Sequence, residues 1–264
     1  MKTWMKVVLG IFAGIAVLLG LVFWLTGDIA KAGDGFFDAA ARDDMDSAYA
    51  LLSSDFQATT SKEKLRAYLE TNGLDDVTDT SWSSRSTSGS TGSLEGTLTT
   101  AKGDEIPINL KLVNSDAGWK IQSISKEQAG FQSDKSSSRQ PLPSKLEALT
   151  LTKATTSDFV DGMAAPTMEG FYGTFSSQFR RDVSLQKLEK GFGSFKGKNF
   201  DMLNGYTPVF SNTGKINDAG ILRIDGYYKT SPRLKFIYEY VFEGVEWKLW
   251  GIDIEAIPLK ELDD

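Results

Sequence analysis

Residues 106–124 read IPINLKLVNSDAGWKIQSI, and this stretch decides the fold of the region around it. Apolar residues take every second position at its start: Ile106, Ile108, Leu110 and Leu112. An alternation of period two predicts an antiparallel strand with one face buried and one face in water. Ser115-Asp116-Ala117-Gly118 has the composition of a turn and residues 119–124 are again strand-like, so the stretch predicts a β-hairpin.

The same pattern continues toward the N-terminus. Residues 94–100 predict a further strand, and Lys102-Gly103-Asp104 predicts the turn that joins this strand to the hairpin. Residues 81–93 are rich in Ser, Thr and Gly around Trp82, which indicates exposed strands with a turn. The region from 81 to 124 is therefore expected to form one antiparallel sheet.

Helical patterns come before these strands. Apolar residues on one helix face recur at Phe37, Ala41, Met45, Ala48 and Leu52. Three aspartates interrupt the pattern: Asp43, Asp44 and Asp46. We interpret them as caps of a second short helix, because a calcium loop would also need a glycine and a distal glutamate.

A third helix is indicated by its two ends. Thr60-Ser61-Lys62-Glu63 predicts a capping box in which Thr60 is the N-terminal cap. Asn72-Gly73 predicts the C-terminal cap. Leu65 and Leu69 would form the buried face between them.

The second half of the chain repeats this order of elements. Residues 159–179 have a helical pattern, Ser184 is expected to cap the next helix, and strand patterns follow at residues 206–210, 220–228, 234–242 and 247–254. Three stretches match between the halves, namely Leu52-Ser53-Ser54-Asp55-Phe56 with Phe175-Ser176-Ser177-Gln178-Phe179, Leu94-Glu95-Gly96 with Ile224-Asp225-Gly226, and Gly118-Trp119-Lys120-Ile121 with Glu246-Trp247-Lys248-Leu249. Their offsets of 123, 130 and 128 residues are nearly constant, which indicates an internal duplication.

The two halves are joined by a stretch of linker composition. Residues 128–145 are polar, rich in serine and contain Pro141 and Pro143. We therefore predict a first domain over residues 33–127, a linker over 128–145 and a second domain over 146–264.

The N-terminal segment predicts a membrane anchor. Residues 7–26 read VVLGIFAGIAVLLGLVFWLT, which is 20 residues without a charge and about 30 Å of helix, the thickness of a bilayer core. Lys2 and Lys6 precede it, so the positive-inside rule predicts a cytoplasmic tip at residues 1–6 and an extracytoplasmic body at the periplasm or cell surface. The alternative is a signal peptide, with cleavage near Ala32 and secretion of the body.

Composition excludes several kinds of chemistry. The formal net charge of -6 and the pI of about 4.9 argue against nucleic acid as a partner, because its phosphates require a basic surface. The chain has 0 Cys and 0 His, so disulfides, thiolate metal sites and a Ser-His-Asp triad cannot form. We expect no metal and no cofactor.

The order of helices followed by strands resembles the nuclear transport factor 2-like superfamily. The residues that carry the resemblance are Asp46-Ser47-Ala48-Tyr49-Ala50-Leu51-Leu52-Ser53, Phe56, Glu95-Gly96, Ile106-Pro107-Ile108, Leu110-Lys111-Leu112-Val113 and Gly118-Trp119-Lys120-Ile121. The second half departs from this pattern, because Met168-Glu169-Gly170-Phe171-Tyr172 replaces the Ala-Tyr signature. The resemblance implies an α+β fold: an N-terminal transmembrane helix, then two tandem cone-like domains, each with helices packed on a curved antiparallel sheet. It fixes no function, since this fold hosts enzymes, binders and scaffolds.

A ligand pocket is the candidate site. The residues that would line it are Trp119, Asp225, Tyr227, Tyr238, Tyr240 and Trp247. Tyr238 and Tyr240 share one face of a strand, and members of the superfamily that enolise ketones pair an acid with a tyrosine donor in an apolar pocket. The competing interpretation is that these aromatic residues only pack the sheet.

These observations lead us to expect a membrane-anchored extracytoplasmic protein that binds or scaffolds, without catalysis. Its partner would be an envelope protein or a small apolar ligand, and a homodimer is a further candidate assembly. The alternatives are a lipid or small hydrophobic ligand binder that uses the cone, and a His-free isomerase or dehydratase that uses Asp and Tyr.

Overall fold

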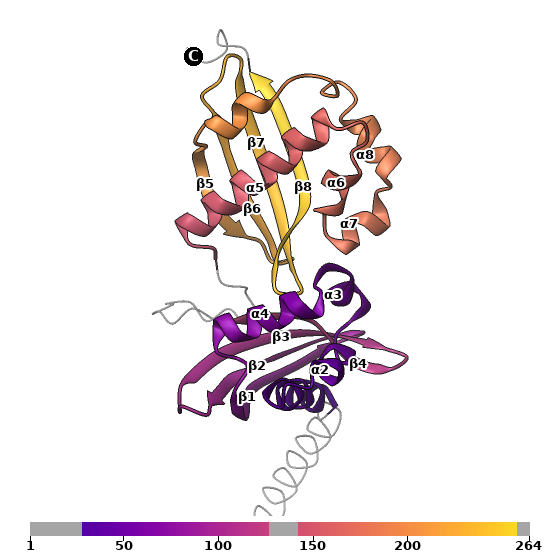
Figure 1. Cartoon of the computed structure of the whole chain (residues 1–264), viewed down its shortest axis with the longest axis vertical. Coiled ribbons are helices and arrows are strands. Elements are labelled where there is room, and N and C mark those ends of the chain that lie inside the picture. Colours follow the sequence, from indigo (N-terminus) through magenta and orange to yellow (C-terminus); the bar gives the residue numbers. More distant parts are fainter. Residues whose placement is uncertain (1–27, 127–141, 258–264) are drawn as a thin grey trace, which may run out of the picture. The chain divides into compact units, whose positions relative to one another are not determined.

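A computed structural model describes residues 28–126 and 142–257 of the chain. Contacts divide the chain into two compact units, Met1–Ser133 and Asp134–Asp264, and each is α+β with its own four-stranded antiparallel sheet. Figure 1 labels their elements. The predicted anchor at residues 7–26 and most of the predicted linker lie outside the described residues. Within the described ranges, no helix is both long enough and apolar enough to span a membrane.

Short, individually capped helices form the helical part of the first unit. Residues 28–41 are helical, and they are followed by α2 (Met45–Ala50), α3 (Ser54–Thr59) and α4 (Lys62–Asn72). Asp44 caps α2, as predicted, by accepting a hydrogen bond from the Ser47 amide. The predicted capping box is one residue off, because Ser61 rather than Thr60 accepts from the Lys64 amide at the start of α4. Gly73, with φ of 66°, ends α4 as expected.

The first sheet is a simple meander. Its strands β1 (Val77–Ser88), β2 (Thr91–Thr100), β3 (Glu105–Ser115) and β4 (Gly118–Lys126) are neighbours in chain order. The alternation that opened the sequence analysis is confirmed, because Ile106, Ile108, Leu110 and Leu112 of β3 are all 7% exposed or less. Burial of each such side chain contributes about 1.5–3 kcal/mol. The strand predicted at residues 94–100 is the second part of β2 rather than a separate element.

The second unit repeats this architecture of helices followed by a four-stranded sheet. Its elements are α5 (Lys145–Ala164), α6 (Glu169–Gly173), α7 (Ser177–Asp182), α8 (Leu185–Gly191), the 3-10 helix η1 (Asp201–Gly205) and strands β5 (Val209–Ile216), β6 (Ile221–Tyr228), β7 (Arg233–Glu243) and β8 (Glu246–Ile257). The prediction of helix from residue 159 was wrong at its start. Helix α5 begins at Lys145, because Ser144 and Glu147 form a capping box that the linker composition concealed. Ser184 caps α8 as predicted.

The two units share contacts at matched positions. A parallel bridge joins Leu52 to Ile121 in the first unit, and its counterpart joins Phe175 to Leu249 in the second. The Ser53 amide donates to the Ile121 carbonyl at 2.8 Å, and the Ser176 amide donates to the Leu249 carbonyl at the same distance. The stretches matched in the sequence analysis therefore occupy corresponding places in each unit.

A tyrosine extends this correspondence where the sequence pattern seemed to end. The Tyr49 hydroxyl reaches the carbonyls of Gln57 and Thr60, each at 2.9 Å. The Tyr172 hydroxyl reaches the carbonyls of Arg180 and Val183 at 2.9 and 2.8 Å, which are 123 residues further on in each case. The second unit thus keeps this tyrosine and its two contacts, although Phe171 replaces the alanine that precedes it in the first unit.

Candidate functional site

Two of the six predicted pocket residues lie in the core of the second unit. Tyr238 and Tyr240 are each 1% exposed and share the inner face of β7, as their spacing predicted. The Tyr240 hydroxyl lies 2.9 Å from Thr155 Oγ1 of α5, and the Tyr238 hydroxyl lies 3.0 Å from Thr156 Oγ1. Tyr228 also reaches Thr156 Oγ1, at 2.7 Å. Helix α5 and three tyrosines therefore fill the space above the sheet with a hydrogen-bonded network.

The direction of these hydrogen bonds follows from Thr156. Its hydroxyl donates to the Thr152 carbonyl at 2.8 Å, so its oxygen is left to accept from Tyr228 and Tyr238. Both tyrosines must then be protonated. Burial, the largest cause, raises the pKa of Tyr228, Tyr238 and Tyr240 above the ordinary value of 10.0. The network is a neutral, packed core at physiological pH.

Two other predicted residues lie on the opposite face of the same sheet. Asp225 and Tyr227 alternate with the buried Ile224 and Tyr228 along β6, so their side chains point away from α5. Asp225 accepts from Arg223 Nε at 3.3 Å. The Arg233 guanidinium lies over the Tyr227 ring, 4.5 Å from its centroid.

The two tryptophans lie at the start of a final strand, one in each unit. Trp119 is partly buried, and a Cβ at Gly92 would come within 3.1 Å of its ring. Trp247 is also partly buried and packs edge-on against Phe242, with ring centroids 5.3 Å apart. Both tryptophans therefore pack against their own unit. Trp119 belongs to the first unit. The other five predicted residues belong to the second unit, where they are divided between the two faces of one sheet.

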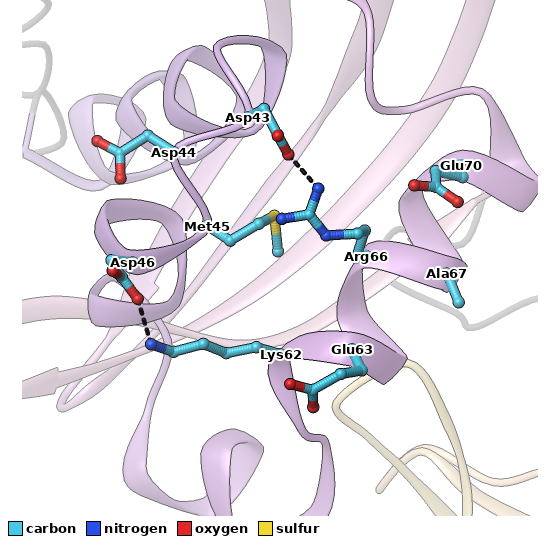
Figure 2. Close-up of a pocket in the computed structure, with 9 residues that line it drawn as sticks. All are labelled: Asp43, Asp44, Met45, Asp46, Lys62, Glu63, Arg66, Ala67 and Glu70. Atoms are coloured by element: carbon cyan, nitrogen blue, oxygen red, sulfur yellow. Dashed lines mark hydrogen bonds and ion pairs between the residues drawn. The ribbon is translucent and has the colours of Figure 1, made fainter.

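A hollow that the sequence did not predict lies on the first unit. It has a volume of about 470 Å³ and lies between the turn before α2 and helix α4 (Figure 2). Five carboxylates and two cations line it together with Met45 and Ala67, and these charged residues are Asp43, Asp44, Asp46, Lys62, Glu63, Arg66 and Glu70. Three of the carboxylates are the aspartates that the sequence analysis interpreted as caps.

The aspartates of this hollow have partners within the unit. Asp43 pairs with Arg66 and Asp46 pairs with Lys62, whereas Asp44 turns away from α4 to cap α2 (Figure 2). Hydrogen bonds from Ser47 lower the pKa of Asp44, which keeps the cap ionised. Across the ranges that the structure describes, no three carboxylates lie close enough together to hold a metal ion. The ion pairs tie the α2 end to α4, and being exposed they add little stability.

A second hollow, which the sequence did not predict, lies on the first sheet. Its volume is about 210 Å³, and its polar side chains are Ser86, Ser88, Thr91, Ser93, Lys111 and Gln122. Lys111 is partly buried, and burial lowers the pKa of its ammonium group. Period two places Lys111 on the wet face of β3, so no local pattern indicated that its side chain would be partly buried.

Comparisons with other proteins assign neither a family nor a function to this chain. No protein-family model matches the chain, and no curated protein matches it significantly.

Proposed function

We propose that this chain is a membrane-anchored extracytoplasmic protein that binds or scaffolds other envelope components and performs no catalysis. The observation that carries this proposal is the Thr–Tyr network of the second unit. In the cone of a nuclear transport factor 2-like domain, an apolar ligand or a substrate would occupy the space that Tyr238 and Tyr240 fill here. Groups for recognition are then supplied by the outer surfaces, including the hollow between α2 and α4.

The separation of Asp225 from the tyrosines supports the same choice. An isomerase or dehydratase without histidine would need an acid and a tyrosine donor on one side of a bound substrate. Asp225 lies on the outer face of the second sheet, and the hydroxyl groups of Tyr238 and Tyr240 are bound to threonines on the inner face.

The proposed location follows from residues 7–26 with Lys2 and Lys6 before them. The absence of cysteine allows a direct test, because an introduced cysteine is the only thiol of the chain. We expect Lys102→Cys, in the exposed β2–β3 turn, to react with an impermeant maleimide on spheroplasts. Lys2→Cys should react only after permeabilisation. Labelling in the reverse order contradicts the proposed topology, and release of labelled Lys102→Cys into the medium indicates a cleaved leader.

The binding role is tested by crosslinking the full-length chain in its own membranes, followed by isolation and mass spectrometry. We expect a discrete adduct with an envelope protein or with a second copy of the chain. Glu63→Lys with Glu70→Lys asks whether the hollow between α2 and α4 contributes, and Asp116→Lys, in the β3–β4 turn, is the matched control. Native mass spectrometry of the extracted chain is the complementary measurement. A small molecule that co-purifies, together with no crosslinked partner, contradicts the scaffold proposal in favour of an interior ligand.

A further inference from the structure

On the outer face of the first sheet, three strands place their side chains side by side at one position of the register. Lys111 of β3 lies directly opposite Ser93 of β2 and Ser123 of β4. This face is opposite to the one that carries the buried Leu94, Leu110 and Ile124, since side chains alternate along each strand. The ammonium group of Lys111 therefore has serines as its cross-strand neighbours and no carboxylate.

The side chain of Lys111 is partly buried at an open hollow of the sheet surface. Among the residues that the structure describes, none forms a hydrogen bond or ion pair with Lys111 Nζ, and no carboxylate lines its hollow. The nearest acid along the register is Glu95, one rung away opposite Asn109. Partial removal from water destabilises a cation that has no counter-charge. An anion that enters the hollow would therefore stabilise the ammonium group of Lys111.

The corresponding rung of the second unit carries charges of both signs. There Arg223 of β6 lies directly opposite Glu239 of β7, and the bulge next to Glu239 repeats the bulge next to Lys111. The Glu239 carboxylate extends over Gly251, whose Cβ would lie 3.0 Å from Glu239 Oε2. The same place in the fold thus carries both signs of charge in one unit and an unbalanced cation in the other.

The rest of the hollow consists of groups that can donate hydrogen bonds. The hydroxyls of Ser86, Ser88 and Ser93 and the amide of Gln122 surround the lysine, and the hollow of about 210 Å³ has room for a small anion. Several donors around one cation match an anion that has several acceptor oxygens. We infer that this hollow is a binding site for a tetrahedral oxyanion of the phosphate or sulfate class, held by Lys111 and the surrounding hydroxyls.

The test uses the full-length chain in neutral detergent, titrated with inorganic phosphate and then with sulfate by calorimetry. We expect both anions to bind, and acetate to bind more weakly because it offers fewer acceptor oxygens. Lys111→Met should weaken binding about tenfold or more, the usual effect of losing a hydrogen bond to a charged group. Ser93→Glu keeps the lysine but places a carboxylate directly opposite it, and should abolish binding. Lys102→Met, an exposed lysine outside the hollow, is the matched control and should bind as the parent chain does.

Two further arms identify the source of the anion. Nanodiscs with phosphatidylglycerol are compared with neutral nanodiscs, and a Lys111-dependent gain on the anionic membrane identifies a lipid headgroup. Binding of free phosphate that is unchanged by lipid identifies a soluble anion. Equal binding by the parent chain and Lys111→Met, or equal binding of acetate and phosphate, overturns the inference. The outcome does not depend on the scaffold proposal, since binding is measured on the purified chain.

Discussion

The two units occupy the space above their sheets with different chemistry. In the first unit the buried positions of β3 hold Ile108, Leu110 and Leu112. The corresponding positions of β7, counted from the shared bulge, hold Phe236, Tyr238 and Tyr240. The helix above changes as well, because the offset that relates Tyr49 to Tyr172 also relates Gly33 to Thr156.

Each helix residue suits the strand residues that it faces. A Cβ at Gly33 would lie 2.7 Å from Trp82 Cζ2 and 3.2 Å from Leu110, so apolar side chains already fill this place. At the equivalent place, Thr156 accepts from two tyrosine hydroxyls. The same fold can therefore be packed with aliphatic side chains or with a hydrogen-bonded network, provided that the helix residue and the strand residues change together.

The largest difference in stability between the two units should appear at alkaline pH. Burial raises the folded-state pKa of Tyr228, Tyr238 and Tyr240 above the unfolded value near 10, so their contribution to stability is complete below pH 10 and is lost as pH rises beyond it. Between the unfolded and the folded pKa, ionisation of each tyrosine lowers the free energy of unfolding by about 1 kcal/mol per pH unit. In the first unit, burial raises the pKa of Tyr68 to about 12.

Hydrogen exchange read by mass spectrometry between pH 9 and 11.5, corrected for the intrinsic exchange rate, checks this prediction. The second unit should lose protection at lower pH than the first, together with the rise of tyrosinate absorbance. Simultaneous loss in both units would show that the network does not control alkaline stability.

Part of this architecture could be predicted from the sequence and part could not. Period two located the strands, and single residues such as Asp44 and Gly73 located helix ends, because these signals are local. The start of α5 was missed, since a run of threonines reads as a poor helix former. Two of these threonines, Thr155 and Thr156, meet tyrosines that lie more than 70 residues away in sequence, and a local pattern cannot reveal such contacts.

The missed correspondence of Tyr172 has a similar cause. The first unit has Ala48 before its tyrosine, and the second has Phe171. The larger ring fits because Gly162 faces it: a Cβ there would lie 2.7 Å from Phe171 Cβ. A search for an Ala-Tyr pair cannot detect such a compensated exchange. For the candidate site, the sequence placed Tyr238 and Tyr240 on one face but could not reveal what that face meets.

Removal of the Thr156 hydroxyl should destabilise the second unit. Thr156→Val keeps the shape of the side chain but leaves Tyr228 and Tyr238 without their acceptor. Each buried hydroxyl left unpaired costs about 1–3 kcal/mol, so we expect the free energy of unfolding to fall by about 2–6 kcal/mol. Thr150→Val, exposed on the same helix, is the control. Denaturant unfolding with unit-resolved hydrogen exchange measures both, and equal effects of the two changes would contradict a structural role for the network.

An added methyl group at Gly33 should destabilise the first unit, because the space beside this residue is already filled. Gly33→Ala places a Cβ against Trp82, and we expect a loss of about 1–3 kcal/mol from overpacking. Gly35→Ala is its control, because the nearest atom to that Cβ is Leu51 Cδ1 at 3.5 Å. In that variant the free energy of unfolding should rise by about 0.5–1 kcal/mol, because alanine has a higher helix propensity than glycine. Thermal unfolding of the two variants should therefore shift in opposite directions, and a gain in both would mean that the space at Gly33 is not filled.

The smallest effect should be the same in the two units. Tyr49→Phe and Tyr172→Phe each remove a hydroxyl that reaches two backbone carbonyls, so each should cost its own unit about 1 kcal/mol. Tyr206→Phe is the control, since Tyr206 is 41% exposed and should be neutral. Unit-resolved hydrogen exchange assigns each loss to its unit. Equal losses support the view that this tyrosine belongs to the shared scaffold, whereas a loss in only one unit would mean that the matched contacts are not energetically equivalent. Because the fillings above the sheets differ and these contacts do not, the tyrosine distinguishes what the fold requires from what each unit has changed.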